Sequence, residues 1–267
     1  MGKRYMSDVN FQSLLDIVKP KIVKIENINS RLTMLEEYSK YAPAKAIANW
    51  SYTLDEANGT VTLQQYTGSE TDVTVYGRYL INGEIYDTKL SCPNAFRGKI
   101  AIKTITFNEG VDTSECVDMI NMFSGCTSLT TINGLENLDT SKVTSMYSMF
   151  KKCTSLVSLD ISSFDVSNVT TMYAMFRNCN KLTSLDLHTW NTSKVGSTGS
   201  MFQDCSLLAS LDLRNWDISK VITMSQMFYN CTNLKEIKAT RGKWVIPSSC
   251  GTTKMFDGCG VSSVTLV

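Results

Sequence analysis

The sequence has few of the features on which common catalytic mechanisms depend. His188 is its only histidine, so no more than one imidazole base is available. It contains no G-x-S-x-G, H-E-x-x-H or P-loop motif, and nothing in it marks two carboxylates that converge as in a glycosidase. We therefore expect a protein that is not an enzyme, with no catalytic residues, no cofactor and no metal site.

The sequence also lacks a large excess of positive or negative charge, and it lacks long apolar runs. The formal net charge of +1 argues against bulk binding of nucleic acid or anionic membrane. No stretch reaches the roughly 18 apolar residues of a membrane span. Residues 1–16 contain no apolar core of a secretory signal, and the last residues, VSSVTLV, contain no wall-sorting or lipidation motif. The expected product is soluble, is made in a cytoplasm and reaches the outside as part of a larger particle.

What the sequence does contain is an internal repeat. Each copy carries a Met-Phe pair and a cysteine three positions after the Phe, and the pairs are separated by steps of 27, 26, 26, 26 and 28 residues. The pairs are Met122-Phe123, Met149-Phe150, Met175-Phe176, Met201-Phe202, Met227-Phe228 and Met255-Phe256. The cysteines are Cys126, Cys153, Cys179, Cys205, Cys231 and Cys259. Six copies in register do not arise by chance, so the signal for a repeat architecture is strong.

The spacing inside a copy predicts the coil that it forms. The clearest copy, residues 175–200, contains L-x-x-L-x-L-x-x-W at Leu182, Leu185, Leu187 and Trp190. Its L-x-L step has the period of two that is typical of a short strand with inward-facing leucines. The S-x-V-x-x-M-x-x-M-F part has spacings of three, which predict a helical or 3₁₀ turn.

One such coil cannot bury its own apolar face, but stacked coils can, at about 4.8 Å per coil where strands pair. The D-x-S steps, such as Asp165 and Ser167, suit a turn in which a side-chain oxygen accepts a backbone N–H. The expected fold is an α/β solenoid over residues 93–267, a leucine-rich-repeat-like stack of about six to seven coils. Its terminal coils are expected to be atypical, because they cap the apolar ends.

The cysteines that recur with the repeat would stack in one file, one coil apart. Metal sites need ligands that are close together, such as C-x₂-C pairs or added histidines, and these cysteines lack that spacing. We therefore interpret each one as a small buried hydrophobe. Cys92, Cys116 and Cys250 lie outside the file, and we expect free thiols there too.

Residues 49–92 are predicted to form a β-rich cap. Asn58-Gly59 is a hairpin signal between alternating segments, and Asn82-Gly83 indicates a second tight turn. The stretch TVTLQQYTGSETDVTV, then INGEIYDTKL, NAFRGK and ITFNEGV, resembles the opening of BspA-like leucine-rich-repeat proteins. The MF-x-x-C-x-x-L units resemble the 26-residue surface-protein repeats of the same broad family, found in bacteria and in some of their phages. The resemblance covers residues 50–265 and implies a leucine-rich-repeat fold with a surface-recognition role.

Residues 1–48 are expected to form a helical oligomerisation and anchoring stalk. Apolar residues there follow the a and d positions of a heptad repeat, and Ile at both positions favours trimers over dimers. The alternative is an amphipathic helix that packs on its own domain. The heptad residues are Phe11, Leu14, Val18, Ile25, Ile28, Leu32 and Leu35.

The outward positions of the predicted strands form a candidate binding surface, which we call the strand face. Solenoids often bind ligands on this concave surface, and Asp160, Asp186 and Asp212 would lie about one strand spacing apart. The alternative is a solvated face whose aspartates are screened by water. The strand-face residues are Ser158, Asp160, Ser162, Ser184, Asp186, His188, Ser210, Asp212, Arg214, Glu236 and Lys238.

Together these features predict a non-enzymatic binding or structural protein, displayed as a phage virion fibre or baseplate component for host attachment. The expected partners are itself as a homotrimer, other virion proteins through residues 1–48, and a host cell-surface protein or glycan; nucleic acid and membrane insertion are not expected. One alternative is a bacterial surface adhesin of the BspA-like type, located at the cell surface. A second is a glycan-degrading enzyme like a tailspike.

Overall fold

The computed structural model describes Ala42 and residues 46–267. Residues 1–41 and 43–45 of the predicted stalk, with all its heptad residues, lie outside the described residues. Within the described part there is no α-helix, and the helical elements are two 3₁₀ helices, η1 (Ala46–Asn49) and η2 (Leu135–Asn137). This part is therefore a β-solenoid, and the α component predicted for the repeats is wrong. It contains no helix that is long and apolar enough to cross a membrane.

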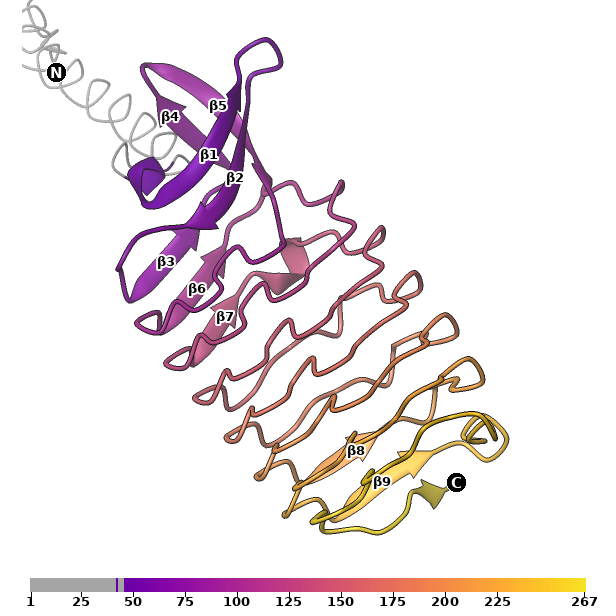
Figure 1. Ribbon diagram of the computed structural model, residues 1–267. Coiled ribbons are helices and arrows are strands. Elements are labelled where there is room, and N and C mark those ends of the chain that lie inside the picture. The colour runs from indigo at the N-terminus through magenta and orange to yellow at the C-terminus, as the bar shows by residue number, and fades with distance from the viewer. Residues whose placement is uncertain (1–41, 43–45) are drawn as a thin grey trace, which may run out of the picture. The chain divides into compact units, whose positions relative to one another are not determined.

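A four-stranded sheet of order β1-β2-β5-β4 covers the N-terminal end of the described stack (Figure 1). Its strands are β1 (Trp50–Asp55), β2 (Thr60–Tyr66), β4 (Arg78–Ile81) and β5 (Glu84–Leu90). β1 and β2 are antiparallel, as are β4 and β5, so both predicted turns are confirmed. Asn82 and Gly83 have φ angles of 52° and 91°, which is the left-handed pair that a tight hairpin turn with right-handed strand twist requires.

The strand side of the solenoid consists of two parallel three-stranded sheets. The first is β3 (Asp72–Val75), β6 (Thr104–Phe107) and β7 (Thr131–Asn133); the second is β8 (Ser210–Asp212), β9 (Glu236–Ala239) and β10 (Thr265–Leu266) (Figure 1). The two coils between them form no regular strand, although Thr183 N–H still donates to the Val157 carbonyl at 3.0 Å. The repeat therefore forms regular strands at β8 and β9, but no regular strand in the two coils between β7 and β8.

The opposite side of each coil, here called the turn side, is not helical. Ser148 and Phe150 donate their N–H groups to the next coil, to the carbonyls of Tyr173 and Met175, both at 2.9 Å. The N–H of Lys151 closes a single turn to the carbonyl of Ser148 at 3.2 Å. Because alternate N–H groups leave the coil, a continuous helix cannot form, and the predicted helical segment is reduced to isolated turns. Residues with positive φ recur at the position of Ser148 in other coils: Asn121, Ala174, Ser200 and Gln226.

The core is a column of phenylalanine rings stacked one per coil. Successive centroids from Phe96 to Phe256 are 5.2 to 5.8 Å apart, and their planes lie within 16° of each other. Tyr66 continues the column with a tilted ring 6.0 Å from Phe96, and its N–H donates to the Ala95 carbonyl at 2.8 Å. The stack therefore has about eight coils, not six to seven, because β2 supplies a coil whose aromatic residue is a tyrosine.

The first five members of the cysteine file are buried, as predicted, whereas Cys259 in the last coil is only partly buried. Each of the five buried thiols also donates to the carbonyl of a phenylalanine in the preceding coil; Cys179 Sγ, for example, lies 3.1 Å from the Phe150 oxygen. Burial raises the pKa of Cys126 and of Cys179 to about 12, so both stay protonated and can donate. The equivalent contacts are Cys126 to Phe96, Cys153 to Phe123, Cys205 to Phe176 and Cys231 to Phe202, at 2.9 to 3.2 Å.

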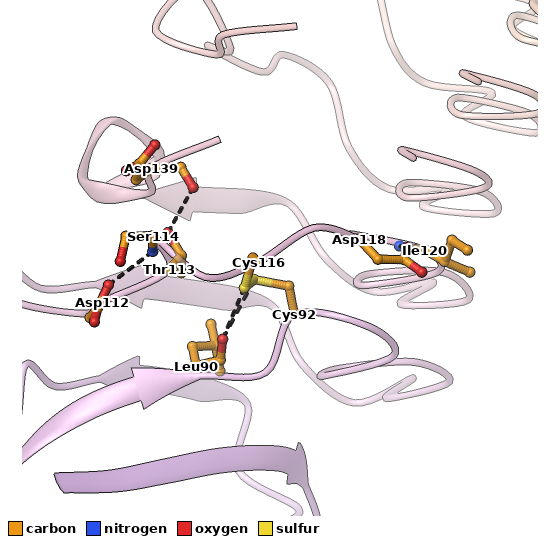
Figure 2. Close-up of a disulfide and its surroundings, with 9 residues drawn as sticks. All are labelled: Leu90, Cys92, Asp112, Thr113, Ser114, Cys116, Asp118, Ile120 and Asp139. Atoms are coloured by element: carbon orange, nitrogen blue, oxygen red, sulfur yellow. Dashed lines mark hydrogen bonds between the residues drawn. A yellow bond between two sulfur atoms is a disulfide. The ribbon is translucent and has the colours of Figure 1, made fainter. Parts of the chain in front are cut away.

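A disulfide joins Cys92, just after β5, to Cys116 in the first full repeat (Figure 2). Their Cα atoms are 6.2 Å apart, and Cys116 Sγ lies 3.0 Å from the carbonyl oxygen of Leu90 at the end of β5. The prediction of free thiols at these two positions is wrong, because the residues meet only where the N-terminal sheet joins the stack. The bond ties that sheet covalently to the repeats. Cys250 is a free thiol, as expected.

Candidate functional site

The structure gathers part of the strand face around one hollow of about 550 Å³. Five predicted residues line it: Ser158, Asp160, Ser162, Ser184 and Asp186. They come from two successive coils. Their side chains face outward because residues that alternate with them, such as Ile161 and Leu185, are buried. The hollow is broad and open to solvent, which suits contact with a surface or a polymer more than enclosure of a small molecule.

The sequence reasoning missed the other wall of this hollow, which is β7. Thr130, Thr131 and Ile132 line it, together with Leu159 of the next coil. Thr131 precedes Ser158 by 27 residues, the same step that separates Phe123 from Phe150. Extension of the repeat register by one coil would therefore have placed β7 on the strand face.

The aspartates of the strand face hold local turns as well as facing solvent. Asp160 Oδ1 accepts the N–H of Ser162 at 3.1 Å and its hydroxyl at 2.7 Å. Asp212 Oδ1 accepts the N–H of Arg214 at 3.2 Å. This pattern, in which a side chain satisfies the N–H two residues on, fixes the corner where the strand ends. These aspartates thus have a structural task that needs no ligand.

The same hydrogen bonds lower the pKa values of these aspartates. Hydrogen bonds from the Ser162 side chain and backbone hold the pKa of Asp160 below its usual range. The side-chain hydrogen bond from Arg214 does the same for the pKa of Asp212. Both aspartates are therefore charged at neutral pH, and they give the strand face fixed hydrogen-bond acceptors.

Arg214 and Lys238 of the strand face are each paired with a carboxylate of their own coil, and His188 contacts one. Arg214 forms a two-pronged pair with Asp212, with Nε–Oδ1 at 2.9 Å and Nη2–Oδ2 at 2.6 Å. Lys238 lies 3.3 Å from Glu236, and His188 Nδ1 contacts Asp186. The sequence reasoning did not predict that Arg214 and Lys238 pair with the acidic residues of their own coils. Asp160 has only hydroxyl and amide partners, so negative charge remains at the hollow.

The hollow is suited to hydrogen bonding by short, exposed groups. Its serine and threonine hydroxyls can donate or accept, and its carboxylates accept. Within the part of the chain that the structure describes, no group of three or more His, Cys, Asp or Glu residues is placed to hold a metal ion. A hydroxyl-rich glycan or a peptide backbone is the kind of ligand that matches these groups.

The sequence matches the family described as "Mycoplasma protein of unknown function, DUF285" over residues 91–209 and 156–265. These two matches together span residues 91–265, which is more than half of the chain. The chain therefore belongs to this family of repeat proteins. No curated protein matches the sequence.

The chain is also similar to solved structures of leucine-rich-repeat proteins. A leucine-rich-repeat protein of T. pallidum is 21% identical, with a TM-score of 0.50 over 78% of this chain and 91% of that chain. A leucine-rich cell surface protein of Faecalibacterium prausnitzii is 16% identical, with a TM-score of 0.37 over 82% and 53% of the two chains. A leucine-rich-repeat protein of Bacteroides ovatus is 19% identical, with a TM-score of 0.36 over 82% and 75%. The first of these likenesses supports the predicted leucine-rich-repeat solenoid.

Proposed function

We propose that the protein is a non-enzymatic binding protein of the adhesin type, whose strand face contacts a cell-surface protein or glycan. The observation that carries this proposal is the hollow of about 550 Å³, lined by short hydroxyl and carboxylate side chains from successive coils. Stacked coils hold such groups in fixed positions, so a ligand can bind without the stack having to rearrange. The similarity to a cell surface protein of Faecalibacterium prausnitzii is in keeping with this role.

The proposed site of action is outside the cell. The Cys92–Cys116 disulfide supports this location, because disulfides persist mainly in oxidising compartments and on cell or virion surfaces. Two settings fit: the surface of a bacterial cell and the fibre or baseplate of a phage virion. In the phage setting, residues 1–48 would form a homotrimer and contact other virion proteins, which would multiply weak contacts through avidity.

Binding to intact bacterial cells tests the function. The variant Ser158→Arg/Ser184→Arg places two long side chains in the hollow, and neither serine side chain has a hydrogen-bond partner among the described residues. We expect about tenfold weaker cell binding, measured by flow cytometry with labelled protein, since loss of one or two contacts is worth about 1–3 kcal/mol. The matched control, Asn180→Arg/Asn233→Arg, adds the same charge at exposed positions away from the hollow. Equal binding by both variants would refute the proposed site.

Light scattering tests the phage setting. The full chain is compared with a chain that begins at Ala42. This residue belongs to the same compact unit as the solenoid, and its N–H donates to the Arg78 carbonyl at 3.0 Å. A trimeric full chain and a monomeric shorter chain would support a fibre. Two monomers at micromolar concentration would remove the argument for a fibre and leave the cell-surface setting.

A further inference from the structure

We propose that a cationic notch on the turn side binds an anionic glycopolymer through the phosphate or carboxylate groups along its chain. The cationic notch consists of Arg97, Ser124, Lys151, Lys152 and Arg177. It lies in a different part of each coil from the hollow of the strand face. The proposal goes beyond the proposed function, because it assigns a ligand class to a second surface.

Main-chain hydrogen bonds place these residues in neighbouring coils of one column. Gly125 N–H donates to the Lys151 carbonyl, and Lys152 N–H donates to the Arg177 carbonyl, both at 2.8 Å. Arg97 occupies the equivalent position two coils before Lys151. Cations therefore recur along the axis of the stack at a spacing fixed by the coils, as a polymer with regularly spaced charges requires.

Short residues separate the cations and make the notch. The coil between Arg97 and Lys151 contributes Ser124 and then Gly125, whose φ of 79° favours glycine. The adjacent residue of the preceding coil, Gly98, also has no side chain, and its Cα lies 3.5 Å from where a Gly125 Cβ would be. The coil between Arg97 and Lys151 therefore has a serine and a glycine where its neighbours have long basic residues.

No carboxylate of the described residues pairs with Lys151, Lys152 or Arg177. The pKa of Lys151 is lowered mainly by burial. The positive charges of Arg177, Lys152 and Arg97 lower it further. The Nε of Arg177 is buried without an acceptor. Arg97 has only a long hydrogen bond, 3.4 Å, to Asn94 Oδ1. An oxyanion bound beside these side chains would relieve the repulsion among the cations.

The notch favours a glycopolymer over other anionic macromolecules. Its five residues include no apolar side chain, whereas protein partners need an apolar contact core. Four cations are also fewer than the roughly six to ten phosphate contacts of a typical duplex-binding protein. The planar guanidinium groups of Arg97 and Arg177 can each bind a phosphate or a carboxylate with two parallel hydrogen bonds.

The test is titration calorimetry of the full chain with four probes: poly(glycerol phosphate), polygalacturonate, inorganic phosphate and a DNA duplex. We expect at least one polymer to bind and binding to weaken as sodium chloride rises, because exposed charges are screened. Binding of both polymers would identify oxyanions in general as the ligand, and binding of one alone would identify its source. Monomeric phosphate should bind far more weakly, since it engages one site at a time.

The variant Lys151→Gln/Arg177→Gln removes two cations and keeps uncharged polar side chains at both positions. We expect the binding constant of the polymer to fall about tenfold, at the upper end for the loss of two partly exposed charge contacts. The matched control, Lys181→Gln/Lys235→Gln, removes two exposed cations elsewhere. It should bind as the unmodified chain does. Melting curves of both variants show whether they are folded.

Three results would overturn the proposal. They are failure of both polymers to bind, an equal loss in the control variant, and tighter binding of a DNA duplex than of either polymer. The Ser158→Arg/Ser184→Arg variant separates this proposal from the proposed function. If it loses cell binding and keeps polymer binding, both stand as independent surfaces. If polymer binding is absent while cell binding still depends on the hollow, only the cationic notch is refuted.

Discussion

The thiol hydrogen bonds of the cysteine file lead to a sharp prediction at Cys179. Its side chain is fully buried, and its Sγ lies 3.1 Å from the Phe150 carbonyl oxygen. That oxygen also accepts the N–H of Cys153 at 3.1 Å, so it keeps one partner when the thiol is removed. The expected loss is therefore smaller than for a buried acceptor left with no partner at all.

Two substitutions separate the donor role of Cys179 from its volume. Cys179→Ala loses the sulfur volume and the hydrogen bond, and we expect it to lower the free energy of unfolding by about 1–2 kcal/mol. Cys179→Ser keeps a donor that can reach the Phe150 carbonyl, and we expect a loss of about 0–1 kcal/mol. The measurement is urea unfolding followed by circular dichroism at pH 7.

The opposite ranking would refute this reasoning. If the cysteine serves only as a small hydrophobe, burial of a hydroxyl makes serine the more damaging change. The free energy of unfolding of Cys179→Ser is then lower than that of Cys179→Ala. Cys250 is the matched control, because it is half-buried and its Sγ is 3.8 Å from the Gly251 oxygen, too far for a strong hydrogen bond. Its Ser and Ala variants should both lie within about 0.5 kcal/mol of the unmodified chain.

Three further predictions concern other contacts. Replacement of Cys92 and Cys116 by serine should lower stability by about 3 kcal/mol, as expected for a loop of 24 residues, and the loss should show in thermal melts without reductant. Asp212→Asn should destabilise at pH 7, and the difference from the unmodified chain should vanish as pH falls below the depressed pKa of the folded carboxyl, because the ionised form is the stabilised one. In hydrogen exchange by NMR, the Phe256 amide, which has no acceptor among the described residues, should exchange much faster than that of Phe150, bonded at 2.9 Å.

Repetition explains why so much of the stack could be predicted from the sequence. The recurring Phe and Cys positions mark residues that touch their equivalents one coil away, so a step of about 26 residues fixes both the register and the core. The D-x-S turns were predictable for a local reason: in each, as at Asp139 and Ser141, the carboxylate accepts the N–H two residues on at 2.9 Å. The two hairpin turns were predictable in the same way, from residue pairs that tolerate positive φ.

The features that sequence reasoning missed depend on contacts between coils. Spacings of three suggested a helix, but the N–H groups of residues such as Ser148 bond to the next coil, and no periodicity shows where a hydrogen bond goes. Tyr66 belongs to the aromatic column although it lacks the Met-Phe pattern, so the first coil was not counted. The partners Cys92 and Cys116 share no repeat position, and only the meeting of β5 with the first repeat brings them together.

The balanced composition also concealed how charge is distributed within the coils. A net charge of +1 argued against bulk binding of nucleic acid or anionic membrane, yet such an argument holds only when charges of both signs are mixed over the surface. In a solenoid each sequence position forms a column along the axis, so a residue type that recurs in the repeat gathers its charge in one place. Asp160 and Asp186 line the hollow on the strand side, whereas Lys151 and Arg177 stand in the cationic notch on the turn side. For a repeat protein, therefore, the charge of each column decides which polymers it can bind, and the net charge of the whole chain is a poor guide.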